Sequence, residues 1–190
     1  MMDEKKSLSR LQRLCSRAEY CSRDIYRKAL ADMEGDGEAA ARIVASLVGE
    51  GYVDDLRYSS AFAREKAALQ GWGPVKIRFQ LRSKGISDSI IETALGEVDP
   101  GASSSRLDRL LAARAKSLKG DPQAKLKLLK FALGRGYEYS AALDEKILHF
   151  VQDDSRGQDD SGGVQDDSGG VQDDSGGDQD DGGDQSFPVQ

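Results

Sequence analysis

The sequence predicts an all-α fold: three tandem three-helix modules in an elongated, curved body, followed by a disordered acidic tail. Apolar residues recur at helical spacing from residue 8 to residue 148, and glycines interrupt these runs at helix-length intervals. A glycine turn that follows an amphipathic helix recurs three times, at Gly51-Tyr52, Gly85-Ile86 and Gly136-Tyr137. We therefore place the modules at residues 7–50, 51–99 and 103–150, each burying its apolar face partly against its neighbour.

The first module is predicted to contain helices over residues 8–20, 22–33 and about 40–48. Leucines in the first of these helices lie on one face, with three arginines opposite. Cys21 precedes the second helix at the cap position, and because a thiol is a poor acceptor we expect an impaired cap there. Gly35-Asp36-Gly37 separates the second helix from the third, which ends at Gly49 and Gly51.

The central stretch, Gly51–Leu95, has the most sharply marked helix starts and ends. Either Asp54 or Asp55 is expected to cap its first helix, because a carboxylate can accept the free N–H groups and meets the positive end of the helix dipole. That helix runs to about Leu69, where Gly71-Trp72-Gly73 breaks it. Nothing in this stretch indicates a strand.

The second helix of the central stretch begins at Pro74, since a proline loses no hydrogen bond at a first helical position. Gly85 is expected to end it in the left-handed conformation. Ser87 is predicted to cap the third helix, with Ile86 and Ile91 forming a hydrophobic staple. The residues that we assign to turns and caps across the chain are Gly51, Tyr52, Asp54, Asp55, Gly73, Pro74, Gly85 and Gly136.

The third module is predicted to follow a short linker, Asp99-Pro100-Gly101. Its first helix covers residues 103–118, and Gly120-Asp121-Pro122 starts a second helix with the aspartate as its cap. Residues 137–150 form a ninth helix. The buried stripe of the second helix is predicted to consist of Leu126, Leu129 and Leu133.

Charge divides the chain into a mildly basic body and a strongly acidic tail. Residues 1–150 contain 26 Lys and Arg against 21 Asp and Glu, a balance of +5, whereas residues 151–190 contain one Arg and 12 Asp, a balance of −11. The tail repeats Val-Gln-Asp-Asp-Ser-Gly-Gly and lacks apolar periodicity, so it cannot offset the entropy of ordering. We favour a tail of little function over an acidic regulatory arm.

The residue types do not assemble a catalytic, metal or cofactor site. His149 is the only histidine, and Cys15 and Cys21 are too few for a disulfide framework or a zinc site. The carboxylates of Asp54 and Asp55 are better explained as caps than as a metal or acid–base pair. We therefore expect no enzyme activity, no cofactor and no metal. Without a signal peptide or a membrane-spanning stretch, we expect a monomeric cytoplasmic protein.

The central motifs, taken in order, resemble those of a known family. They are G-Y-V-D-D-x-R-Y, a helix, G-x-G, a basic helix and L-x-x-K-G-I, and together they resemble the RecX family of regulators of the RecA recombinase. The resemblance covers about residues 8–148. It implies a protein that binds the RecA–DNA filament and inhibits recombinase, ATPase and co-protease activity in DNA repair, DNA recombination and the SOS response.

Basic side chains are the best candidates for contacts with such a partner, whether the recombinase filament itself or its single-stranded or duplex DNA. For an arbitrary helical protein we would favour a solvated helix face, and the family resemblance gives partner contacts the same weight. Trp72 is similarly expected to cover its own core rather than stack on a base. Two other functions stay open, a helical regulator that binds DNA directly and a scaffold that binds only protein. The candidate residues are Arg64, Lys66, Lys76, Arg78, Arg82, Lys84, Lys125, Lys127, Lys130 and Arg135.

Overall fold

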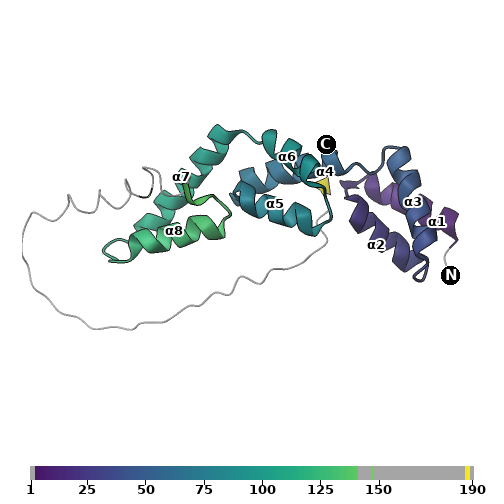
Figure 1. Cartoon of the computed structure of the whole chain (residues 1–190), viewed down its shortest axis with the longest axis horizontal. Helices are drawn as coiled ribbons and strands as arrows, with labels where there is room; N and C mark the ends of the chain where they lie inside the picture. The colour runs from purple at the N-terminus through teal and green to yellow at the C-terminus, as the bar shows by residue number, and fades with distance from the viewer. Residues whose placement is uncertain (1–2, 141–146, 148–186, 189–190) are drawn as a thin grey trace, which may run out of the picture.

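The structure, a computed structural model, describes residues 3–140, Ile147 and residues 187–188. It confirms the all-α prediction, and Figure 1 shows the helices following one another along an elongated body. The helices are α1 (Glu4–Cys15), α2 (Ser22–Asp32), α3 (Gly37–Gly49), α4 (Asp55–Glu65), the π-helix η1 (Lys66–Gln70), α5 (Pro74–Ser83), α6 (Asp88–Gly96), α7 (Pro100–Lys116) and α8 (Ala124–Gly134).

Buried apolar side chains gather into three clusters that follow the chain. The first joins α1, α2 and α3 around Leu11, Ile25 and Leu47, and the second joins α4, α5 and α6 around Phe62 and Leu81. A third cluster lies between α7 and α8. Each set of helices thus has its own core, as expected when a short module buries one face and leans on its neighbour.

The first predicted helix is too long at its C-terminal end, since α1 stops at Cys15 rather than continuing to residue 20. Tyr20 packs in the first cluster and Cys21 in the second, so these adjacent side chains point to opposite sides. Alternating directions require extended backbone, not helix. Residues Ala18–Glu19 accordingly form a two-residue strand, β1, which pairs antiparallel with β2 (Phe187–Pro188). The remaining tail residues lie outside the described part of the chain.

The central helices begin and end close to the predicted positions, with two differences. The first helix continues past α4 as the π-helix η1 before Gly71, whose φ is +64°. Ser87 stands at the cap position of α6, but its side chain makes no capping hydrogen bond and its Oγ lies 3.2 Å from that of Ser89. Ile86 and Ile91 are both buried in the second cluster, as the predicted staple requires.

The third module departs most from the prediction. Asp99 and Pro100 are not a linker: the carboxylate of Asp99 accepts from the Gly101 N–H and caps α7. On α8 the predicted buried stripe is wrong for two of its three leucines, because Leu126 is 47% and Leu133 is 42% exposed, whereas Leu129 is partly buried against the third cluster. The buried residues of α8 are Leu128 and Ala132. The helix begins at Ala124 with Gln123 at its cap position, not at the predicted Asp121 cap, and its buried positions lie one to two residues from Leu126 and Leu133.

The ninth predicted helix, residues 137–150, lies mainly outside the described residues, and so does His149. Within it, Tyr139, Ser140 and Ile147 are helical, and the Ile147 side chain is buried in the third cluster. Within the described part of the chain, no helix is both long and apolar enough to cross a membrane.

Candidate functional site

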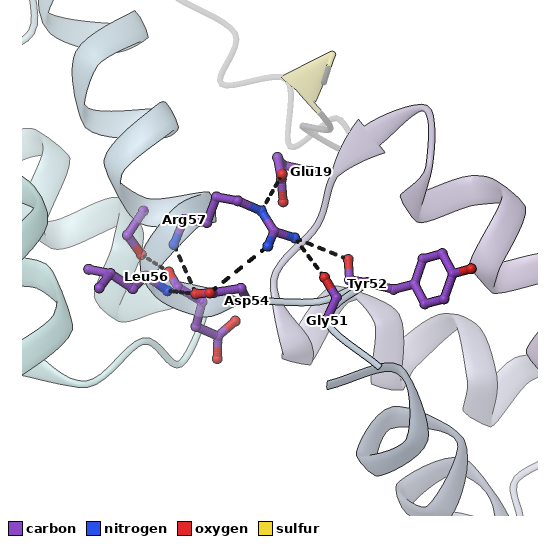
Figure 2. Close-up of polar contacts among 8 residues, drawn as sticks. Glu19, Gly51, Tyr52, Asp54, Leu56 and Arg57 are labelled. Atoms are coloured by element: carbon purple, nitrogen blue, oxygen red, sulfur yellow. Dashed lines mark hydrogen bonds and ion pairs between the residues drawn. The ribbon is translucent and has the colours of Figure 1, made fainter. Parts of the chain in front are cut away.

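Arg57 is the centre of the junction between the first two modules, shown in Figure 2. Its Nε donates to Oε1 of Glu19 on β1 at 2.5 Å, and its Nη2 donates to the carbonyl oxygens of Gly51 at 3.2 Å and Tyr52 at 3.4 Å. Its Nη1 lies 4.0 Å from Oδ2 of Asp54. The guanidinium therefore ties β1, the Gly51 turn and the start of α4 together, and the hydrogen bond to Glu19 raises the pKa of Arg57.

The two adjacent aspartates cap two different helices. Oδ1 of Asp54 accepts from the N–H groups of Leu56 and Arg57, which caps the helix of Asp54 itself. Oδ1 of Asp55 instead accepts from the N–H of Ser22 at 2.7 Å, the first residue of α2 in the preceding module. The thiol of Cys21 makes no capping bond to the backbone, as predicted, and the carboxylate of Asp55 takes over that role. Capping, rather than metal binding, thus accounts for both carboxylates.

A second contact between these modules joins α2 to the end of α5. Nζ of Lys84 donates to Oδ2 of Asp24 at 2.7 Å, and Nη2 of Arg27 donates to the other oxygen at 2.7 Å. Nη1 of Arg23 donates to the Ser83 carbonyl at 2.9 Å. Burial opposes ionisation of Asp24, but the hydrogen bonds from Lys84 and the Cys21 thiol, with the charges of Lys84 and Arg27, lower its pKa below that of an ordinary aspartate.

The junction between the second and third modules is made by backbone. The N–H of Gly73 donates to the Arg135 carbonyl at 2.8 Å, and the N–H of Val75 donates to the Gly136 carbonyl at 3.0 Å. These carbonyls satisfy N–H groups at the start of α5. A Cβ on Gly136 would overlap the Cβ of Lys76, so the glycine, whose φ is +82°, is required by both contact and conformation.

Two cavities lie at this second junction. One, of about 400 Å³, is mainly apolar and is bounded by Trp72 and Ile77 of the central module and Leu107 and Tyr137 of the third. The other, of about 330 Å³, lies between the α4–η1 segment and α7 and contains the side chains of Arg64, Arg106 and Arg109.

Most of the predicted partner-binding cations on the central module are held in local ion pairs. Arg64 pairs with Glu97 at 2.7 Å. Arg78 donates to both carboxylate oxygens of Glu92, at 2.8 and 3.0 Å. Arg82 pairs with Asp88 at 2.7 Å. These pairs raise the pKa of Arg78 and of Arg82, and they leave the guanidinium charges largely compensated on the surface.

The three central lysines do not form an outward-facing basic surface. Lys66 is buried, with 4% of its surface exposed and its Nζ above the rings of Phe62 and Trp72. Lys84 belongs to the contact with Asp24 described above. Nζ of Lys76 lies 4.6 Å from the Trp72 ring centroid. Trp72 itself packs edge-to-face on Phe62, so its role in covering the core is confirmed.

The candidates in the third module are dispersed. Lys125 and Lys130 are exposed on α8, while Lys127 pairs with Asp121 at 2.5 Å. Arg135 belongs to the second junction, where its Nη1 donates to the Gln70 carbonyl at 2.7 Å. The structure therefore brings no single basic patch together from the predicted residues.

Sequence reasoning missed two kinds of surface residue. Phe79 on α5 is 67% exposed although it is aromatic, and its neighbour one turn back, Val75, is also exposed. Arg106 and Arg109, one turn apart on α7, line the smaller cavity. The spacing of the two arginines was a usable signal, whereas the exposure of Phe79 follows only from which face of α5 is buried.

Neither cysteine has the surroundings of a reactive thiol. Burial raises the pKa of Cys15 to about 11 and that of Cys21 to about 12, with smaller electrostatic contributions. In the described part of the chain, no cluster of histidine, cysteine and acidic residues could hold a metal ion.

These features define an all-α protein of serial helical modules, in which each junction satisfies the N-terminal amides of a preceding helix. Residues 54–95 match the family model described as RecX, second three-helix domain. A regulatory protein RecX of Thermus thermophilus is 30% identical over 139 residues, which cover 73% of this chain and 89% of that protein. The chain belongs to the RecX family.

Other relatives agree with this assignment. The regulatory protein RecX of Mycobacterium sp. strain KMS is 33% identical over 115 residues, covering 57% of this chain but only 63% of that relative. The chain thus spans less than two thirds of the length of this mycobacterial relative. The crystal structure of a regulatory protein RecX has a TM-score of 0.67 at 24% identity, covering 79% of this chain and 71% of that one. The crystal structure of RecX from Lactobacillus salivarius has a TM-score of 0.65 at 19% identity, covering 80% of this chain and 97% of that one. These two structures share the fold.

Proposed function

We propose that this protein binds the RecA–DNA filament and restrains its recombinase, ATPase and co-protease activities. The observation that carries the proposal is membership of a family of regulatory proteins, with the family model matching the central module. The proposed partner comes from the family resemblance of the motifs G-Y-V-D-D-x-R-Y and L-x-x-K-G-I. We place the protein in the cytoplasm, where the filament forms, and propose that it acts as a monomer.

The junctions described above support a binding role for the body as a whole. Arg57 and Asp55 hold the first module to the second, and the backbone around Gly73 and Gly136 holds the third. A body held at both junctions can present surfaces of all three modules to a long partner at once. Because those surfaces are ordered before binding, less conformational entropy is lost on association.

Inhibition by such a body would act through occupancy rather than chemistry. Each bound molecule would cover recombinase surface or DNA that the filament needs in order to grow or persist. The proposed contacts include the exposed cations Lys125 and Lys130, which have no local role in the junctions. The ion-paired Arg78 and Arg82 would contribute by exchanging their carboxylates for acidic groups of the partner.

The test is a titration of the full chain into a RecA ATPase assay that depends on single-stranded DNA. We expect ATP hydrolysis to fall as the protein approaches the concentration of recombinase. A core variant that is unfolded, such as Leu81→Asp, serves as the control for nonspecific inhibition, because Leu81 is fully buried. A flat response at stoichiometric protein contradicts the proposal. Binding to duplex DNA of one particular sequence, with no effect on ATP hydrolysis, would indicate a direct DNA-binding regulator instead.

A further inference from the structure

Two arginines of α7 line the cavity between α4 and α7, and one of them, Arg106, also donates to the Leu69 carbonyl across the second junction. Arg106 and Arg109 lie one turn apart on α7, and Arg64 of α4 completes the basic lining of a volume of about 330 Å³. Among the described residues, no ion pair joins Arg106 or Arg109 to a carboxylate, in contrast to Arg64, which pairs with Glu97. Two positive charges therefore face this cavity without a paired carboxylate.

The guanidinium of Arg106 is partly buried but makes few hydrogen bonds to offset the loss of contact with water. Its Nη2 donates to the carbonyl of Leu69 at 3.1 Å, while its Nε is buried and has no hydrogen-bond partner among the described residues. Arg109 has only a long contact, 3.4 Å, from its Nε to the carbonyl of Ser105. A charged group that is partly withdrawn from water and bonded only to neutral acceptors is stabilised by an anion placed beside it.

The acidic side chains that line the same cavity are already engaged. Glu97 is paired with Arg64 at 2.7 Å, and Oδ1 of Asp99 accepts from the Gly101 N–H at 2.8 Å as the cap of α7. The lining therefore carries three guanidinium groups against two occupied carboxylates. The excess positive charge belongs to the α7 arginines.

We propose that this cavity binds a phosphate group of a nucleic-acid strand, held by Arg106 and Arg109. Guanidinium groups present paired N–H donors that match phosphate oxygens, and two such groups one helical turn apart can approach one tetrahedral anion from neighbouring directions. The inference deepens the proposed function and rests on it for the source of the strand, which is the DNA of the filament.

The experiment measures binding of the full chain to a fluorescent single-stranded oligonucleotide by anisotropy, without recombinase, across a range of salt concentrations. Arg109→Gln is the principal variant, because Arg109 is exposed and its loss should leave the melting temperature unchanged. We expect its affinity to fall by about tenfold, the value of one charge-assisted hydrogen bond. The log–log salt slope should become shallower by up to about 0.7, the value for one phosphate contact, because Arg106 still contacts the same phosphate. Arg13→Gln, the loss of an exposed arginine on α1, is the matched control and should leave both unchanged.

Arg106→Gln provides a second reading of the same site. If both side chains hold one phosphate, the double variant should lose less affinity than the two single losses combined. Arg106→Lys keeps the charge but not the paired donors, so we expect it to bind as weakly as Arg106→Gln. If Arg106→Lys binds the oligonucleotide as tightly as the wild type, only nonspecific electrostatic attraction acts at this position, and the proposal is overturned.

The remaining outcomes separate this inference from the proposed function. Oligonucleotide affinity that is unchanged in both arginine variants overturns the phosphate site, and if ATPase inhibition is lost in those variants the cavity binds a carboxylate of the recombinase. If oligonucleotide binding depends on the two arginines while ATP hydrolysis does not respond to the protein, the phosphate site is supported and the proposed inhibition of RecA is contradicted. A nucleoside triphosphate added alone distinguishes the sources of phosphate. If the nucleoside triphosphate raises the melting temperature only when Arg109 is present, the cavity binds a free nucleotide, and the proposal that it binds a nucleic-acid strand is overturned.

Discussion

The two junctions of this protein achieve the same result with different chemistry. In each, the second helix of a module has its free N-terminal amides satisfied by the module that follows. The first junction uses a side chain, the carboxylate of Asp55 on the Ser22 N–H, whereas the second uses main-chain carbonyls of Arg135 and Gly136. Helix N-termini thus serve as the points at which successive modules recognise each other.

The difference lies in what each junction demands of the sequence. The first junction requires particular charged residues, Glu19 and Asp24 on one side and Arg57 and Lys84 on the other. The second requires the absence of a side chain, because a Cβ on Gly136 would overlap Lys76. We therefore expect the stability of the first junction to fall when a charged side chain is removed or the pH is lowered. The stability of the second junction should fall when a side chain is added to a glycine.

The largest effect should come from adding bulk at the second junction. Gly136→Ala places a Cβ on top of that of Lys76 at a φ of +82°, so strain and overlap act together. We expect the free energy of unfolding to fall by roughly 2–5 kcal/mol, measured by chemical denaturation. Gly120→Ala is the control, since Gly120 has a φ of +78° but nothing within 4 Å of an added Cβ. Its cost should be about 1 kcal/mol, and equal costs at the two positions would contradict a close approach of the backbones.

At the first junction, the largest effect should follow the loss of Arg57. Arg57→Ala leaves the Glu19 carboxylate, only 9% of whose side chain is exposed, without its cation. We expect a destabilisation of about 1–3 kcal/mol, which is less than for a fully buried pair because Arg57 itself reaches solvent. Arg57→Lys should recover part of it, since lysine restores the charge but not the forked contact to the carbonyls of Gly51 and Tyr52.

The matched control for this prediction is Arg64→Ala. Arg64 pairs with Glu97 on the surface of the central module, where both side chains are largely exposed. Such a pair contributes about 0.2–1 kcal/mol. If the loss of Arg64 costs as much as the loss of Arg57, the first junction has no special dependence on its ion pair.

A smaller and more local effect is expected from the aspartate that caps across the junction. Asp55→Ala removes the only carboxylate that accepts from the Ser22 N–H within the described structure, at a cost of about 0.5–2 kcal/mol. Hydrogen exchange locates the effect: amides at the start of α2 should exchange faster, although the change is in α4. Asp54→Ala should instead accelerate exchange at Leu56 and Arg57. Protection of α2 that survives Asp55→Ala would mean that the cap is not needed.

The contrast between the junctions also explains what the sequence could predict. A helix start with a local cap, such as Asp54, and a helix end with a glycine, such as Gly85, are set by neighbours in sequence and were predicted. The role of Asp55 could not be found this way, because its partner Ser22 is 33 residues away. The end of α1 was missed for a similar reason, since Tyr20 and Cys21 turn toward different cores.

The candidate site was predicted less well than the fold. Lysines and arginines were selected as exposed charges, but whether a cation is free depends on carboxylates brought close by folding. Arg78 meets Glu92 and Lys84 meets Asp24 only once α5 packs against α6 and α2. Lys66 is buried because the helix widens into η1 and turns its side chain over Phe62 and Trp72. The spacing of Arg106 and Arg109 places them on one face of α7, but that spacing does not indicate that the face borders a cavity between modules.

The smallest effect we predict is the response of the first junction to acid. The pKa of Asp24 is lowered from its ordinary value in the folded protein, because the hydrogen bonds from Lys84 and the Cys21 thiol and the charges of Lys84 and Arg27 outweigh the effect of burial. A depressed carboxylate pKa contributes stability that is complete above the unfolded value and is lost as the pH falls through the folded value. The free energy of unfolding, measured in urea between about pH 6 and pH 3, should therefore decline more steeply in the wild type than in Asp24→Asn. The decline should be accompanied by faster amide exchange in α2 and the end of α5, while the amides of Gly73 and Val75, bonded only to carbonyls, keep their protection. Parallel pH profiles for the two proteins, or equal loss of protection at the two junctions, would show that acid does not distinguish them.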